Sequence, residues 1–220
     1  MQEIEAKFFV LDLKKIERRL QDLGAHLIQP RVLETNIRFD LPDGGLRSEG
    51  RVLRLRQDSE ARLTYKSGSV NEQGVLNRTE IEFVVEDFGK AKAFIEALGY
   101  QRLFYYEKYR TTYALDSAGK LAESQKQASG FHNCHIMLDE LPYGDFVEIE
   151  GEGVDSIRAV ADRLGLRWDR AVPTSYHVLF ERLWAIHPDL DPRELSFAAL
   201  GGRKVSVEEL SIAAGDEHDA

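Results

Sequence analysis

The chain has 220 residues and a formal net charge of −9, because 38 Asp and Glu residues outnumber 29 Lys and Arg residues. The negative balance argues against general binding to nucleic acid or to anionic membranes, although a local basic site stays open. With a single cysteine, Cys134, the chain can form neither an internal disulfide nor a cysteine-based zinc site. There is no long apolar run and no signal-peptide pattern near Met1, so we expect a soluble cytoplasmic protein.

The first predicted element is a strand over residues 2–10. Side chains alternate between the two faces of a strand, so one face is charged and the other apolar. The two sets are Glu3, Glu5 and Lys7 against Ile4, Ala6 and Phe8. The Glu-Ile-Glu triplet of residues 3–5 returns at 80–82 and at 148–150. Paired carboxylates can hold a divalent cation through oxygen ligands, whereas the plainer interpretation is a strand face in water.

Helices and further strands follow along the chain. Apolar residues at spacings of three and four, each with a closing glycine, predict helices over 12–23, 87–98 and 155–164. Strands are predicted over 35–40, 51–57, 61–66, 77–85, 106–115, 135–139 and 145–150, and the polar segment 117–133 is expected to be an exposed loop. Each Glu-Ile-Glu strand leads to a helix that ends in Leu-Gly, which indicates a repeated strand–helix unit in a mostly antiparallel sheet. After residue 184 we expect a short helix over 193–200, and the last residues, 215–220, are expected to be disordered.

Charged side chains share one face of these strands, opposite the apolar residues. The acids are Glu3, Glu5, Glu80, Glu82, Asp139, Glu148 and Glu150. The bases are Lys7, Arg54, Arg56, Lys66, Arg78, Lys108 and Arg110. An open sheet with its charged face in water explains this alternation equally well. However, Arg and Lys outnumber Ser and Thr on the central strands, and about eight strands are enough to close a barrel with the charges inside.

Charges that line such a lumen have to be compensated, because burying them alone is too costly. A linear phosphate chain with a divalent metal ion compensates both signs. Arginine binds phosphate through two parallel hydrogen bonds, lysine adds a point charge, and carboxylates hold the metal. The residues alone therefore leave two interpretations open, a polyphosphate site and a solvated sheet face.

The segment Glu3-Ile4-Glu5-Ala6-Lys7 resembles the Glu-x-Glu-x-Lys signature that opens the CYTH family, the triphosphate tunnel metalloenzymes. The resemblance continues through residues 53–56, 64–66, 78–82, 108–110 and 144–150, ends near the Ser175-Tyr176 pair, and covers residues 1 to 184. The run 144–150 and the Ser-Tyr pair look most like the class IV adenylyl cyclases. One departure is His177, where relatives often carry Arg or Lys, and residues 185–220 have no counterpart in the pattern.

The resemblance implies an α+β fold in which a closed eight-stranded antiparallel β-barrel forms a triphosphate tunnel, with helices packed outside. It implies a tunnel domain over residues 1–184, a C-terminal extension over 185–220, and Mg²⁺ or Mn²⁺ as cofactor. The expected metal ligands are Glu3, Glu5, Glu148 and Glu150, with Asp139, Glu80 and Glu82 as second choices. The residues expected to bind the phosphates are Lys7, Arg54, Arg56, Lys66, Arg78, Lys108 and Arg110.

The activity that the resemblance implies first is that of an adenylyl cyclase, which converts ATP to cyclic AMP and pyrophosphate. A triphosphatase that hydrolyses tripolyphosphate or thiamine triphosphate needs nearly the same tunnel and stays an alternative. A protein that binds a polyphosphate or nucleotide without turnover is the third hypothesis, and the complete set of acids argues against it. No general base can be assigned. The six histidines show no metal-ligand spacing, so surface or structural roles are expected for them.

Overall fold

The computed structural model describes the backbone of residues 2–72, 75–116 and 133–216. It describes their side chains except at positions 2–3, 68–72, 75–78, 116 and 133. The loop predicted over 117–133 therefore lies almost wholly outside the described residues. The structure contains the three helices predicted over 12–23, 87–98 and 155–164, together with a mostly antiparallel sheet. The predicted α+β class is therefore confirmed.

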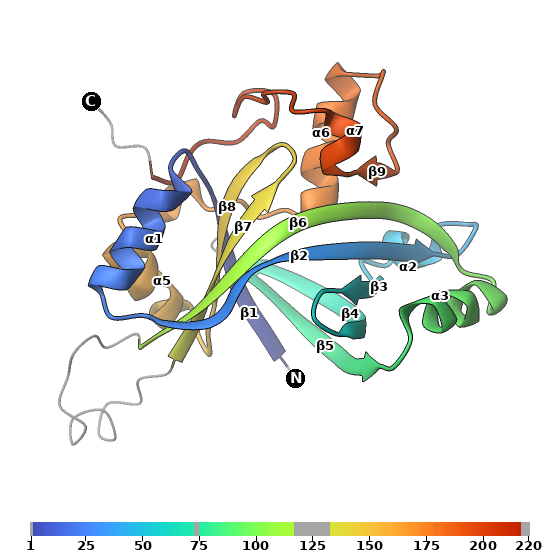
Figure 1. The fold of residues 1–220 in the computed structure, drawn as a ribbon, viewed down its shortest axis with the longest axis horizontal. Helices are drawn as coiled ribbons and strands as arrows, with labels where there is room; N and C mark the ends of the chain where they lie inside the picture. The colour runs from blue at the N-terminus through green and yellow to red at the C-terminus, as the bar shows by residue number, and fades with distance from the viewer. Residues whose placement is uncertain (1, 73–74, 117–132, 217–220) are drawn as a thin grey trace.

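One sheet of nine strands forms the centre of the fold (Figure 1). Its strands are β1 (Gln2–Val10), β2 (His26–Asp40), β3 (Val52–Gln57), β4 (Ala61–Glu72), β5 (Val75–Val85), β6 (Gln101–Asp116), β7 (Asn133–Leu141), β8 (Gly144–Glu150) and β9 (Glu194–Leu195). They are ordered β2-β3-β4-β5-β1-β8-β7-β6-β9, and β2 pairs with β6 in addition to β3. The β2–β6 register runs from His26 opposite Ala114 to Asp40 opposite Gln101. Among the pairings between named strands in the described residues, only the short β6–β9 pairing is parallel, and an isolated parallel bridge also joins Phe9 and Ala214.

A helix follows each strand that carries the Glu-Ile-Glu triplet, so the predicted strand–helix unit is present. These helices are α1 (Leu13–Asp22) after β1, α3 (Phe88–Ala97) after β5 and α5 (Val154–Arg163) after β8. The Asp12 side chain accepts a hydrogen bond from the backbone N–H of Lys15, which satisfies a donor that the first helical turn leaves open. Gly24 follows α1 with a φ of 78°, a left-handed conformation that glycine adopts without a steric penalty.

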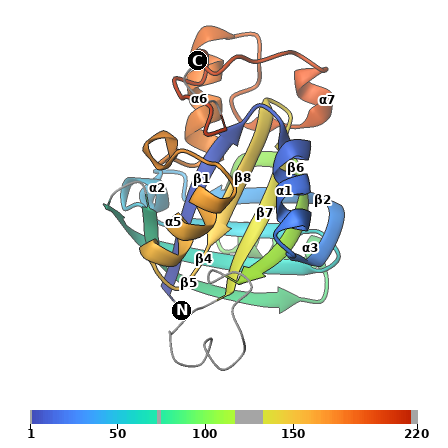
Figure 2. The ribbon, with the colours of Figure 1, turned by 90° about the vertical axis from the view of Figure 1, so that its left-hand side faces the viewer.

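Helices cover much of the apolar strand faces, although Ile81 and Phe83 of β5 stay exposed, and the charged faces lie on the other side of the sheet. Helices α1 and α5 lie over β1, β7 and β8 (Figure 2). There Ile16 and Val160 pack with Phe8 and Ile149 in a buried cluster. Helix α3 adds Ile95 to a second cluster with Ile37, Phe39 and Leu55 of β2 and β3. The burial of these apolar groups fixes the strand registers, because a slip of one residue would expose them.

The C-terminal part packs against the same sheet. It contains a 3₁₀ turn (Trp168–Arg170), α6 (Tyr176–Ile186), β9 and α7 (Phe197–Leu200). Its buried apolar residues share a cluster with Phe104 and Phe146, and they include Leu179, Phe180, Leu183, Leu190, Leu195, Leu200, Leu210 and Ala214. The one described helix not yet named, α2 (Gly45–Ser48), lies earlier in the chain, directly after β2.

The chain end is tied to β1 at two residues of the tail that was expected to be disordered. The N–H of Gly215 donates to the carbonyl of Phe9 at 2.7 Å, and Asp216 accepts from the N–H groups of Leu11 and Asp12 at 2.9 and 3.1 Å. Residues 217–220 of that tail lie outside the described residues. The boundary placed at residue 184 falls within α6, and the division into two parts stays a prediction. Among the described residues, no helix is both long and apolar enough to cross a lipid bilayer.

Candidate functional site

A cavity of about 860 Å³ lies against the charged strand faces. Nine basic side chains and five carboxylates line it. The bases are Lys7, Arg38, Arg47, Arg51, Arg54, Arg56, Lys66, Lys108 and Arg110, and the acids are Glu5, Glu80, Glu82, Glu148 and Glu150. Positive charge is thus in excess in the cavity although the whole chain carries a net charge of −9. Such a concentration of one sign in a partly enclosed space attracts ligands of the opposite sign, here anions.

The most buried ion pairs join β1, β6, β7 and β8. Asp139 is fully buried and accepts from Arg110 Nε at 2.6 Å and from Lys108 Nζ at 3.0 Å. Arg110 also donates to Glu148, whose other oxygen lies 3.0 Å from Lys7 Nζ. Burial by itself would raise the pKa of Glu148, but the charges of Lys7, Arg110 and Lys108 hold that pKa well below its usual value. Glu148 therefore stays ionised, and Glu148 and Asp139 fix the orientation of the bases through these short contacts.

A further buried acid, Glu34 of β2, was not predicted from the sequence. Its carboxylate lies 3.5 Å from Lys108, 3.8 Å from Arg56 and 4.0 Å from Arg110, and it accepts from Asn36 Nδ2 at 3.0 Å. Burial opposes ionisation, yet the charges of Lys108, Arg110 and Arg56 lower the pKa of Glu34 far below its usual value. Glu34 therefore compensates the positive charge of three bases without lining the cavity itself, because it is buried beneath them.

The wall formed by β3, β4 and β5 carries partly paired arginines. Glu82 accepts from Thr64 Oγ1 at 2.7 Å and lies 3.3 Å from Arg56 and 3.7 Å from Arg54. The Nε atoms of Arg51, Arg54 and Arg56 are buried and have no hydrogen-bond partner among the described residues. Buried donors of this kind normally have acceptors, so their arrangement fits an anionic ligand in the cavity.

Three carboxylates of β1 and β8 could hold a divalent cation. The strand register places Glu5 directly opposite Glu150, and both line the cavity together with Glu148. Within the described part of the chain, no group of three or more His, Cys, Asp or Glu side chains is arranged to bind a metal ion by itself. Mg²⁺ is commonly held by one or two carboxylates plus phosphate oxygens of a substrate. The donor set therefore fits a metal ion that binds together with a phosphate chain.

The start of α6 also faces the cavity. Ser175 caps the helix by accepting from the N–H of Val178, and Tyr176 and His177 line the cavity after it. The Tyr176 hydroxyl donates to Asp139 at 2.8 Å, and Lys7 Nζ lies 4.1 Å from the centre of the Tyr176 ring. Burial raises the pKa of Tyr176 well above its usual value, so the hydroxyl remains a donor at neutral pH. The start of helix α6 thus joins the buried network of ion pairs through the hydrogen bond from Tyr176 to Asp139 of β7.

Surface or structural roles were expected of the histidines, and the surface role does not apply to His177, which is buried. Its ring stacks on Phe104 with 4.3 Å between ring centres, and its Nδ1 lies 3.4 Å from Arg38 Nη1. Burial, together with the charges of Arg38 and Arg47, lowers the pKa of His177 to about 3. The ring is therefore neutral at physiological pH.

The cavity brings together all but three of the residues predicted for the site. Asp139 lies behind the bases instead of lining the cavity. The strand register places Glu3 opposite Arg78, but both side chains lie outside the described ones. The lining residues that the sequence reasoning missed as site residues include Arg38, Arg47, Arg51, Tyr106 and His177. The sequence did contain a signal for Arg38. It lies on a predicted strand, two residues after Asn36, so both polar side chains share one face of that strand.

Comparison with known proteins adds a family. A model of the CYTH domain matches residues 1–162, whereas no curated protein matches the chain. The PH1012 protein of Pyrococcus horikoshii OT3 is 26% identical, with a TM-score of 0.59 over 79% of this chain and 96% of that one. A conserved hypothetical protein of Pyrococcus furiosus is 24% identical, with a TM-score of 0.59 over 79% and 97% of the two chains. A Vibrio parahaemolyticus protein whose name proposes an adenylate cyclase is 17% identical, with a TM-score of 0.64 over 79% and 94%. The family model spans well over half of the sequence, and the chain therefore belongs to the CYTH domain family.

Proposed function

We propose that the protein is a divalent-metal-dependent enzyme that cleaves a triphosphate substrate bound in the cavity. The observation that carries the proposal is the lining, in which nine bases gather around the cavity together with five carboxylates. Carboxylates that face the cavity repel phosphate unless a metal ion lies between them, so their presence among the bases supports a metal ion that binds together with the substrate. The proposal includes a closed barrel of strands β1 to β8, which is supported by the pairing of β2 with both β3 and β6.

The bases are proposed to hold the phosphates, and the buried acids to hold the bases. Arg56, Lys108 and Arg110 each contact Glu34, so these side chains are oriented before a ligand arrives. Groups that are positioned in advance stabilise developing charge without having to reorganise during the reaction. Mg²⁺ or Mn²⁺, held by Glu5, Glu148 and Glu150, would neutralise charge on the phosphates and position the attacking oxygen.

Two activities are candidates, and they differ in the attacking oxygen. In an adenylyl cyclase it is the ribose 3′-hydroxyl of ATP, and the resemblance of residues 144–150 to class IV enzymes favours this reaction. In a triphosphatase it is water. The lining favours that alternative, because fourteen of the twenty-two residues around the cavity are charged groups suited to phosphate and metal rather than to a nucleobase.

The test is incubation of the protein with ATP, thiamine triphosphate or tripolyphosphate, each with Mg²⁺ or Mn²⁺, followed by identification of the products. Cyclic AMP with pyrophosphate identifies a cyclase, and release of orthophosphate identifies a triphosphatase. Tight metal-dependent binding without any product from all three substrates would instead support the binding protein and contradict the proposal.

A further inference from the structure

Arg38 lies in a strongly positive part of the cavity. On β2 it sits directly opposite Arg54 of β3, and Arg47 and Arg51 line the same cavity. Like charges at directly opposite positions of two strands repel each other. Keeping the Arg38 guanidinium aimed at a ligand therefore requires an acceptor that holds it.

His177 supplies such an acceptor. Its Nδ1 lies 3.4 Å from Arg38 Nη1. A guanidinium nitrogen can only donate, so Nδ1 accepts with its lone pair and the ring proton is on Nε2. Nε2 faces Glu181, with 4.0 Å between the nitrogen and the carboxylate oxygen. The ring plane is fixed by stacking on the fully buried Phe104, at 25° between the two planes.

The neighbouring Arg47 is held in a different way. Its Nη2 donates to both carboxylate oxygens of Glu181, at 2.7 and 2.9 Å. An acid holds an arginine and also cancels much of its charge. A neutral imidazole holds an arginine and leaves the full positive charge available to a phosphate. The low pKa of His177 keeps the ring neutral, and therefore able to accept, throughout the physiological pH range.

We infer that His177 is a positioning residue, which fixes Arg38 for a phosphate group of the substrate without cancelling the charge of Arg38. The inference rests on the proposed function, because it takes a triphosphate as the ligand of the cavity. It also gives a physical meaning to the presence of His177 at a position where similar proteins often carry Arg or Lys. A charged Arg or Lys side chain has no lone pair with which to accept a hydrogen bond from Arg38.

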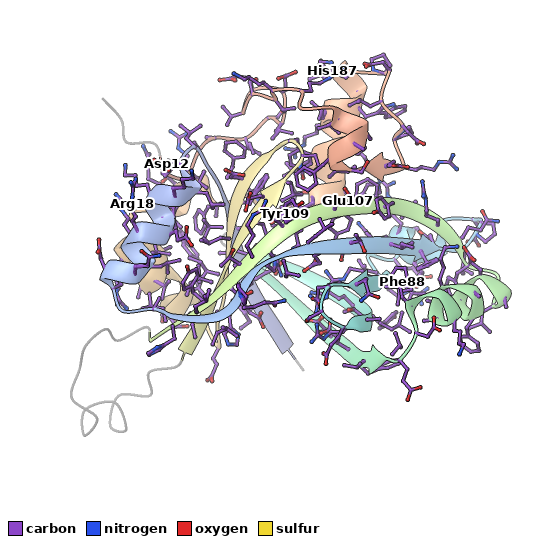
Figure 3. All side chains as sticks on the ribbon, in the orientation of Figure 1. Asp12, Arg18, Phe88, Glu107, Tyr109 and His187 are labelled. Carbon is purple, nitrogen blue, oxygen red and sulfur yellow. The ribbon has the colours of Figure 1, made fainter. Side chains whose placement is uncertain are left out.

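The test compares two substitutions at position 177. His177→Phe keeps a ring for stacking on Phe104 but has no acceptor, whereas His177→Asn places a carbonyl oxygen near the position of Nδ1. The matched control is His187→Phe, at the C-terminal end of the same helix (Figure 3), where His187 pairs with Glu209 at 2.6 Å and does not line the cavity. Binding of tripolyphosphate to the metal-free proteins is measured by titration calorimetry, and melting temperatures confirm that each variant is folded.

Loss of one hydrogen bond to a charged ligand-binding group is expected to weaken tripolyphosphate binding by roughly three- to tenfold in His177→Phe. Binding by His177→Asn should stay within about twofold of the parent, and binding by His187→Phe should be unchanged. In an Arg38→Ala background, His177→Phe should cause no further loss, because the two residues act as a unit. A merely structural role of His177 would weaken binding equally with and without Arg38.

Undiminished binding by His177→Phe, or an equal loss in the Arg38→Ala background, overturns the inference while the proposed function stands. Failure of the parent protein to bind tripolyphosphate overturns both. If His177→Phe melts far below the parent, His177→Leu, which is smaller and also lacks an acceptor, takes its place in the same comparison.

Discussion

Replacement of Glu34 by Gln tests whether buried acids hold the basic side chains of the cavity. The Glu34 side chain is 1% exposed and lies within 4.0 Å of Lys108, Arg56 and Arg110. Gln keeps the shape and an acceptor for Asn36, but it removes the negative charge. Removing one partner of a buried ion pair costs about 3–5 kcal/mol, and the amide that Gln retains reduces this to about 2–4 kcal/mol. For a chain of this length the melting temperature should fall by about 5–15 °C.

The loss of unfolding free energy caused by Glu34→Gln should depend on pH. The pKa of Glu34 is lower in the folded protein than its ordinary value of 4.5, so its stabilising contribution is fully present above pH 4.5. That contribution is lost as the pH falls through the lower, folded-state pKa. The difference in unfolding free energy between parent and Glu34→Gln should therefore be largest at neutral pH and should shrink below pH 4.5. Added tripolyphosphate should raise the melting temperature of the variant more than that of the parent, because the ligand returns negative charge to the same bases.

The assay is chemical and thermal unfolding of parent and variant between pH 3 and pH 8. The matched control is Glu60→Gln, which removes an acid whose side chain is 52% exposed and lies 2.6 Å from Arg62. An exposed pair of this kind contributes at most about 1 kcal/mol, so the control should stay close to the parent. Equal stability of Glu34→Gln and parent at pH 7 would refute the reasoning that Glu34 compensates the bases.

Two further predictions concern the ligand-free and ligand-bound protein. Arg54→Ala should weaken tripolyphosphate binding by on the order of 2 kcal/mol, since charge-assisted bonds in a water-poor site are strong, and it should leave the ligand-free melting temperature nearly unchanged. If calorimetry finds that Arg54→Ala binds tripolyphosphate as tightly as the parent, the assignment of β3 to the binding site is wrong. Tripolyphosphate at a hundred times its dissociation constant should stabilise the fold by about 2.7 kcal/mol, whereas orthophosphate at the same concentration should do far less. Equal shifts by both anions in a melting experiment would indicate nonspecific charge screening.

Much of the candidate site could be predicted because strands obey a strict period of two. Once the apolar face of β1 is assigned to the core, Glu5 and Lys7 must face the other way, and the same holds for Arg54 and Arg56 on β3. The helix ends were predictable for a similar local reason. The Asp12 cap and the left-handed Gly24 are properties of a few neighbouring residues.

Glu34 was missed because the strand that carries it is irregular. The prediction began this strand at residue 35, whereas β2 starts at His26 and changes register between Gln29 and Val32, on either side of Pro30. Proline cannot donate to a strand ladder and interrupts the local pattern that predicts a strand. The partners of Glu34 then come from β3 and β6, the two strands that pair with β2 on either side, and these pairings cannot be read from the local sequence.

Helix α6 and the chain end were missed for another reason. Apolar residues lie all around α6, including Val178, Phe180, Leu183 and Ile186, so no amphipathic stripe marks it as a helix. The contacts of Asp216 are made with residues more than 200 positions earlier in the chain. Packing between such distant segments leaves no local signal in the sequence.

The most direct test of the central claim is turnover of tripolyphosphate and ATP by the parent and Glu5→Gln across a range of Mn²⁺ concentrations, beside tripolyphosphate binding without metal. Glu5 lines the cavity opposite Glu150, and Gln keeps its shape while removing the charge that a hard cation needs. The account predicts metal-dependent turnover by the parent, loss of that turnover in Glu5→Gln, and retained binding of tripolyphosphate in both proteins. Full activity in Glu5→Gln, or no turnover of either substrate by the parent at any metal concentration, would contradict it.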